Sequence, residues 1–275
     1  MASLTAALLL FAATCAGQDS LIYTPVGSSE VPGALYPAVI PPTQNSVDAL
    51  LADNAGGLYY AACGGAVVRY IYPDLRTSAL IAGACYPPPG RPLGDGGPAT
   101  AALLRGVQAL ALNGSGLFIG ETASRGLRFV SFATGVISSI GGPWTTAACL
   151  AWLAAPSPFA GALAVGSRVD FRAWAFFPQN GSAAPLAGSG VAPSAGNYNA
   201  NPVDAAAATL APRACAGAPP NSLWPGALIL ADANAGVIRA RLANGSVMTI
   251  VGAGFMASGS PVGTFTGSMG KPAKA

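Results

Sequence analysis

The sequence predicts an all-β protein built from a repeated unit of four short strands. Four segments share one layout, in which apolar runs alternate with Gly-rich turns until a last strand ends in glycine. In three segments, an arginine of the third strand precedes an apolar residue of the fourth strand by twelve positions. These pairs are Arg69 and Ile81, Arg128 and Ile140, and Arg239 and Val251. Such a small sheet cannot bury both of its faces alone, whereas sheets stacked around an axis form a continuous core. The repeat therefore predicts a β-propeller.

Four blades are expected, and each is justified by apolar runs bounded by turn residues. The blades are 47–83, 107–142, 149–188 and 221–252. The first two show all four strands clearly. In the third blade the arginine, Arg172, precedes Leu186 by 14 positions, so the spacing departs from the others. The fourth blade has a weak first strand near Asn221–Trp224, followed by three clear strands.

Composition excludes several other classes of protein. Only 8% of the residues are charged, 52% are apolar, and the chain contains 36 glycines and 24 prolines. A net charge of +3, without basic clusters, excludes charge-driven nucleic-acid binding. Disordered segments are polar, which does not fit a mean hydropathy of +0.50. Small residues suit closely packed blades, and no apolar run reaches the roughly 20 residues of a membrane span.

The first residues resemble a signal peptide. The apolar stretch 5–16 has the length of the central region of such a peptide, and cleavage after Ala16 would leave small residues at the positions that signal peptidase reads. A bacterial lipoprotein signal ending before Cys15 and a short buried helix are the alternatives. We expect segment 1–16 to be removed and the mature protein to be secreted and extracellular.

Cysteine and Asn-Gly-Ser patterns agree with export. Beyond the leader, Cys63, Cys85, Cys149 and Cys215 could form two disulfides, with three connectivities open. Three Asn-Gly-Ser sequons are candidate glycosylation sites in a eukaryotic cell. They lie at Asn113, Asn180 and Asn244. Because Asn-Gly is also a strong hairpin signal, the same residues could simply form turns.

The segment 81–142 resembles the NHL-repeat family. Its string Gly94-Asp95-Gly96-Gly97-Pro98-Ala99-Thr100 is similar to that family's "GDGGPAT" connector between blades, and the strands at 107–121 and 126–130 are similar to those that follow it. The resemblance covers roughly 25–275, is most specific at 81–142, and implies a propeller of usually six blades. Segment 201–207 is a degenerate copy of the connector, and segment 259–275 resembles the start of a further one. We therefore expect an incomplete six-bladed ring.

Charged residues of the repeats are interpreted as structural. Glu121 and Asp232 each precede a repeat arginine by seven positions, which favours local pairing with Arg128 and Arg239. Asp95 in the connector favours a turn held by carboxylate hydrogen bonds over a calcium or phosphate loop. Arg69 and Arg172 lack an acid at that spacing and form the freer pair, a candidate groove for an anionic partner.

The sequence contains no candidate catalytic residues and no metal site. Without any histidine, neither a Ser-His-Asp triad nor a Cys-His pair can be assembled. No cofactor is expected. The alternative is a metal-dependent hydrolase or lyase of the six-bladed type, or a degenerate fragment of one, with carboxylates around its channel.

Long loops and clustered aromatics favour a binding function. The loops at 86–106 and 189–220 join blades, and binding tends to reside in loops held by a rigid scaffold. Aromatic residues gather in the first and third repeats, where they either recognise a ligand or fill space between blades. We expect a protein or carbohydrate partner, no nucleic acid and no transmembrane span. Open blade faces would allow self-association.

Overall fold

The computed structural model describes residues 47–53, 55–73, 78–85, 93–123, 126–193, 202–232 and 234–252. The chain divides into two compact units, Met1–Ala148 and Cys149–Ala275. The predicted signal peptide at 1–16 and the predicted connector at 259–275 lie outside the described residues. Within those ranges, none of the helices has the length and apolarity needed to cross a membrane.

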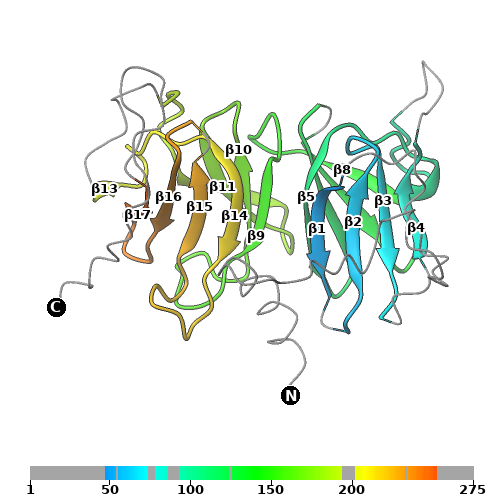
Figure 1. Ribbon diagram of the computed structural model, residues 1–275, viewed down its shortest axis with the longest axis horizontal. Coiled ribbons are helices and arrows are strands. Elements are labelled where there is room, and N and C mark those ends of the chain that lie inside the picture. The colour runs from blue at the N-terminus through cyan, green and yellow to red at the C-terminus, as the bar shows by residue number, and fades with distance from the viewer. Residues whose placement is uncertain are drawn as a thin grey trace, which may run out of the picture. The chain divides into compact units, whose positions relative to one another are not determined.

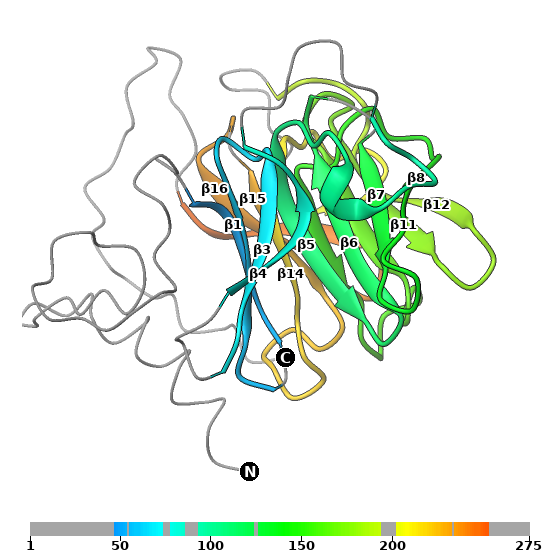
Figure 2. The ribbon, with the colours of Figure 1, turned by 90° about the vertical axis from the view of Figure 1, so that its right-hand side faces the viewer.

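Unit 1 contains two four-stranded antiparallel sheets (Figure 1). The first has the order β1-β2-β3-β4, with strands Val47–Ala52, Leu58–Ala62, Val67–Ile71 and Ser78–Gly83. The second has the order β5-β6-β7-β8, with strands Val107–Asn113, Gly116–Glu121, Leu127–Ser131 and Ile137–Ile140, and can be followed in Figure 2. A short 3-10 helix, η1 at Ala99–Ala101, precedes the second sheet.

Unit 2 also contains two antiparallel sheets. The first has the order β9-β10-β11-β12, with strands Cys149–Trp152, Leu163–Ser167, Arg172–Phe177 and Ser182–Ala187. The second has strands β14 to β17 at Pro212–Gly217, Leu228–Asp232, Val237–Arg241 and Ser246–Val251. A two-residue strand, β13 at Val203–Asp204, pairs with β17 and makes this a five-stranded sheet.

These meanders confirm the predicted fold class, an all-β protein of four antiparallel β-propeller blades. The strands repeat in detail as well as in order. A one-residue irregularity interrupts the pairing of the first and second strands in three of the four sheets, at Val47/Ala49, Val107/Ala109 and Pro212/Ala214. Such bulges increase local twist, which the sheets of a propeller require. The expectation that the ring is incomplete stays a prediction.

The fourth blade begins earlier than the sequence predicts. Its first strand is β14, and segment 221–224 is not a strand but part of the turn that joins β14 to β15. Within this turn the backbone N–H of Ser222 donates to the carbonyl of Pro219. The strand was hard to recognise because Pro-Arg-Ala-Cys-Ala-Gly has no large apolar side chain, while the turn contains Leu223 and Trp224.

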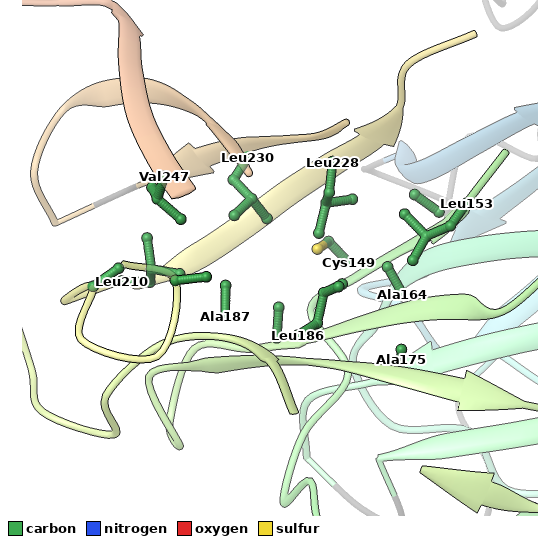
Figure 3. Close-up of a cluster of buried hydrophobic side chains, with 14 of the residues drawn as sticks. Cys149, Leu153, Ala164, Ala175, Leu186, Ala187, Leu210, Leu228, Leu230 and Val247 are labelled. Atoms are coloured by element: carbon green, nitrogen blue, oxygen red, sulfur yellow. The ribbon is translucent and has the colours of Figure 1, made fainter. Parts of the chain in front are cut away.

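Small side chains let the two sheets of each unit pack closely. In unit 2 the buried cluster combines Leu210, Leu228 and Leu230 with alanines from the other sheet, including Ala164 and Ala175 (Figure 3). Unit 1 has a comparable cluster around Leu104, Leu117 and Ile119. Protein interiors are densely packed, and a small side chain lets a neighbouring sheet come close. The alanine-rich strands therefore serve as contact surfaces between the sheets.

The four cysteines form two disulfides, in one of the three possible connectivities. Cys63 pairs with Cys85, so unit 1 has one disulfide within its first blade. Cys149 of β9 pairs with Cys215 of β14, so the second disulfide joins the two blades of unit 2. Each pair therefore closes within one unit.

Candidate functional site

The connector motif of the second blade forms a structural turn around Arg128. The guanidinium of Arg128 is fully buried, and its Nη2 forms a salt bridge of 2.7 Å with Asp95 Oδ1. Its Nη1 and Nη2 also donate to the carbonyls of Leu103 and Leu93, each at 3.0 Å. The other oxygen of Asp95 accepts from the Ser139 hydroxyl at 2.6 Å.

The glycines of the same motif complete this turn. The N–H of Gly97 donates to the carbonyl of Gly94, the N–H of Gly96 donates to the carbonyl of Ile137, and Pro98 forms a bridge with Val136. Gly94 and Gly96 have positive φ angles of 82° and 80°, which glycine adopts without strain. These contacts tie the connector to β8 and favour the structural interpretation of Gly94 to Pro98.

Glu121 has a role apart from this salt bridge. It is fully buried, and its Oε1 accepts a hydrogen bond of 2.7 Å from the backbone N–H of Arg105. The acid that pairs with Arg128 therefore comes from the connector, 33 residues earlier in the chain, and not from the position seven residues before. The sequence spacing singled out Glu121 as a structural carboxylate but indicated the wrong partner for Arg128.

The fourth blade repeats this arrangement with fewer partners. Arg239 is fully buried, and its Nη1 donates to the carbonyl of Thr209 at 2.9 Å, as Arg128 does to Leu103. Nε and Nη2 of Arg239 have no hydrogen-bond partner among the described residues, and the same holds for Oδ2 of Asp232. Burial raises the pKa of Asp232 and lowers that of Arg239.

In the third blade a tryptophan occupies the position of the repeat arginine. Strand pairing aligns Trp174 opposite Val165, just as Arg69 lies opposite Tyr60 and Arg239 opposite Leu230. The same bulge in the pairing with the fourth strand falls immediately before Arg69, Trp174 and Arg239. Leu186 follows Trp174 by twelve positions, so the spacing of 14 from Arg172 reflects a wrong alignment by two residues.

Arg172 lies two positions before Trp174, which holds the repeat position, and it borders a cavity in unit 2. The cavity has a volume of about 470 Å³. Its walls come from β11, from the end of β12 with Gly188, from the segment 204–206 that enters the fourth blade, and from Arg241 and Gly245 of that blade. A volume of this size lies in the usual range of small-molecule sites.

Two arginines dominate the chemistry of this cavity. Nη2 of Arg172 donates to the carbonyl of Ser189 at 3.0 Å, and its guanidinium carbon lies 5.8 Å from the ring centre of Trp174. Arg241 is 6% exposed, and its guanidinium carbon lies 4.9 Å from the ring centre of Phe159. Nε and Nη1 of Arg241 have no hydrogen-bond partner among the described residues, and burial lowers its pKa.

The other freer arginine predicted from sequence, Arg69, does not share this site. It belongs to unit 1, where its Nη2 donates to the hydroxyl of Ser78 at 3.1 Å. Arg172 alone of the predicted pair borders the cavity, and Arg241 was not recognised from sequence. The only signal for Arg241 was its place two residues after the repeat arginine Arg239, on the same face of β16.

A second polar-aromatic cluster lies in unit 1. Asp53 accepts a hydrogen bond of 2.6 Å from the hydroxyl of Tyr70, which raises the pKa of Tyr70 to about 12. Burial alone would raise the pKa of Asp53, but bonds from Tyr70 and from the N–H groups of Gly57 and Ala55 lower it. Through these contacts Asp53 caps the β1–β2 turn.

The three sequons lie in hairpin turns. In each, the Asn Oδ1 accepts hydrogen bonds from the backbone N–H and the hydroxyl of the serine two residues later. Asn113 follows this pattern between β5 and β6, Asn180 between β11 and β12, and Asn244 between β16 and β17. The three asparagines therefore form turns, as Asn-Gly predicts. Their glycosylation stays a prediction.

In the described part of the chain, the side chains form no group of three or more His, Cys, Asp or Glu that could hold a metal ion. The carboxylates of Asp53, Asp95, Glu121 and Asp232 each accept at least one hydrogen bond, from backbone N–H groups, hydroxyls or Arg128.

This protein is similar to solved structures, but its sequence matches no model of a known protein family and no curated protein. Virginiamycin B lyase from Staphylococcus aureus is similar with a TM-score of 0.46 and 11% identity, over 76% of this chain and 55% of the lyase chain. A chain of a nidogen/laminin complex has a TM-score of 0.46 and 9% identity, over 71% of this chain and 58% of its own.

A third similar structure is the extracellular domain of a hybrid two-component system from B. thetaiotaomicron. Its TM-score is 0.49 and its identity 9%, over 79% of this chain and 23% of its own. This chain thus spans little more than half of the lyase and nidogen/laminin chains. Similarity at this level assigns neither an activity nor a ligand.

Proposed function

We propose that this protein is an exported NHL-type β-propeller module that binds a protein or glycan partner without transforming it. The observation that carries the proposal is the cavity of unit 2, whose walls include the segments that leave the third blade and enter the fourth. Such connecting segments on a rigid sheet scaffold are where binding residues tend to lie.

Two further observations support the family and the compartment. Ala99 N–H bonds the carbonyl of Gly135 in the second blade, and Ala205 N–H bonds that of Gly245 in the fourth, so both connectors contact their blades alike. Both disulfides are of the kind that persists in oxidising compartments. N-terminal sequencing of the secreted protein is expected to begin at Gly17.

Binding is tested with the full chain on a surface-plasmon-resonance panel of polysaccharides and extracellular matrix proteins. We expect saturable, reversible binding to at least one of them. Ala206 is exposed and borders the cavity, so Ala206→Trp should weaken binding at least tenfold. Ala133→Trp, at an exposed alanine of the β7–β8 turn in unit 1, should leave binding unchanged.

The same samples distinguish binding from catalysis. Mass spectrometry of the bound partner should show no change in mass, and elemental analysis should show no stoichiometric metal. Stoichiometric calcium or zinc with a chemically altered partner would overturn the proposal in favour of the metal-dependent enzyme. An Ala206→Trp variant that binds as tightly as the parent chain would remove the cavity from the proposal.

A further inference from the structure

We propose that the cavity of unit 2 binds the carboxylate of an acidic saccharide through Arg241 and Arg172. This inference rests on the proposed function, because it names the ligand of the same cavity. The fold leaves the positive charge of Arg241 without a counter-ion in the described part of the chain. Arg241 is 6% exposed, and no carboxylate among the described residues forms a salt bridge with it.

A buried cation without a counter-ion is costly for the free protein. Charged side chains are rarely buried unless they are paired, and the aromatic ring of Phe159 compensates only in part. Two of the three guanidinium nitrogens of Arg241 lack a hydrogen-bond partner, and burial lowers its pKa. An anion that enters the cavity would supply the missing negative charge where the dielectric screening is weak.

Arg172 supplies a second positive charge to the same cavity. Its guanidinium is held by the Ser189 carbonyl and lies over the Trp174 ring, so it is already ordered before a ligand arrives. Charge-assisted hydrogen bonds from arginine to carboxylate are about twice as strong as neutral ones, and their planar fork favours a planar anion. Two preorganised arginines therefore favour a carboxylate.

The remaining residues of the cavity favour a sugar as the body of the ligand. Asp204, exposed on the rim, offers carboxylate oxygens that accept hydrogen bonds from hydroxyl groups. Pro185, Leu186 and Ala187 at the end of β12 form the adjoining wall. A cavity of about 470 Å³ accommodates a compact group, whereas peptides are usually bound along an open sheet edge or a long groove.

The test measures binding of digalacturonate to the full chain by isothermal titration calorimetry. Its fully methyl-esterified form keeps the sugar rings but lacks the charges, so we expect it to bind at least tenfold more weakly. Arg241→Gln and Arg172→Gln should each weaken digalacturonate binding at least tenfold. Arg213→Gln removes one positive charge from an exposed position of β14 and should leave the affinity within twofold.

Each outcome decides the proposal. Equal binding of the methyl ester, or equal binding by both cavity variants, would overturn the carboxylate site. Equal or tighter binding of a Glu-Glu dipeptide would replace the saccharide with an acidic peptide. No binding of digalacturonate by a chain that still binds a partner on the wider panel would overturn this inference alone and leave the proposed function standing. Circular dichroism of Arg172→Gln, whose side chain is half-buried, verifies that the loss does not reflect unfolding.

Discussion

The second and fourth blades place an arginine at the same repeat position but surround it differently. In the second blade Arg128 has a carboxylate and two carbonyl groups as partners. In the fourth, Arg239 has one carbonyl, and two of its nitrogens lack partners among the described residues. A buried arginine can therefore occupy the same repeat position in two blades although only the second blade provides it with a salt bridge.

The sequence explains this difference at one position. Aligned on the carbonyls that the two arginines contact, Leu103 and Thr209, the connectors place Asn201 where the second blade has Asp95. Asn201 lies outside the described residues. An amide carries no charge, so the aligned position provides no counter-ion in the fourth connector.

The largest effects are expected from removal of the disulfides, one of which lies in each unit. The pairs Cys63–Cys85 and Cys149–Cys215 are separated by 22 and 66 residues. Chain-entropy arguments give about 3 kcal/mol for the shorter loop and about 4 kcal/mol for the longer one. Urea unfolding of C63S/C85S and C149S/C215S should therefore show the larger loss for unit 2, and a reversed order would contradict the loop argument.

Breaking the salt bridge of the second blade should cost about 3 kcal/mol. Asp95→Asn leaves the guanidinium of Arg128 buried without its counter-ion, although the 34% exposure of Asp95 lets water reduce the loss. Unfolding in urea measures the change. Asp95→Asn combined with Arg128→Met removes both charges and should cost less than Asp95→Asn alone; a double variant at least as unstable would contradict a buried-charge penalty.

The equivalent change in the fourth blade should have a smaller effect. Arg239→Met removes a poorly satisfied buried cation, but it also removes the charge that attracts the buried carboxylate of Asp232, so the relieved desolvation and the lost attraction oppose each other. We expect the free energy of unfolding to change by less than about 1 kcal/mol, against a clear loss for Arg128→Met. Equal losses in both variants would show that the missing hydrogen bonds of Arg239 do not matter to stability.

The smallest effect concerns pH and the Asp53–Tyr70 pair of unit 1. The folded-state pKa of Tyr70, about 12, lies above its ordinary value near 10, so its contribution is complete below pH 10 and lost as the pH rises toward 12. Asp53 has a lowered pKa, so its contribution is present above about pH 4 and lost as the pH falls.

Tyr70→Phe removes the hydrogen bond and should flatten both ends of this profile. Urea unfolding of the parent chain and the variant at pH 3, 7 and 11 measures it. The difference in stability between the two proteins should be largest at pH 7. A difference that is the same at all three values would show that the hydrogen bond is not coupled to either titration.

Much of the fold could be predicted because local signals agree along the chain. Apolar alternation, Gly-rich turns and the twelve-residue spacing all indicate the same four-stranded unit. The prediction failed where these signals were weak, at the first strand of the fourth blade and in the register of the third. In both places small or aromatic residues replaced the usual pattern, and only strand pairing identified the equivalent positions.

Less of the candidate site than of the fold could be predicted from the sequence. Arg172 was selected for the lack of a nearby acid, but the same rule selected Arg69, which belongs to the other unit. Nothing in the sequence related Arg241 to Asp204, because the two residues are 37 positions apart in the chain and come together only at the cavity.

By itself, the sequence determined the repeated unit, the all-β class and the small-residue packing of the blades, since these follow from local periodicity and side-chain size. The tertiary structure decided which cysteines pair, that Asp95 serves Arg128, and that Arg172 and Arg241 border one cavity. The physical reason is that pairing energies act at distances of a few ångströms, and separation along the chain does not reveal which residues come that close.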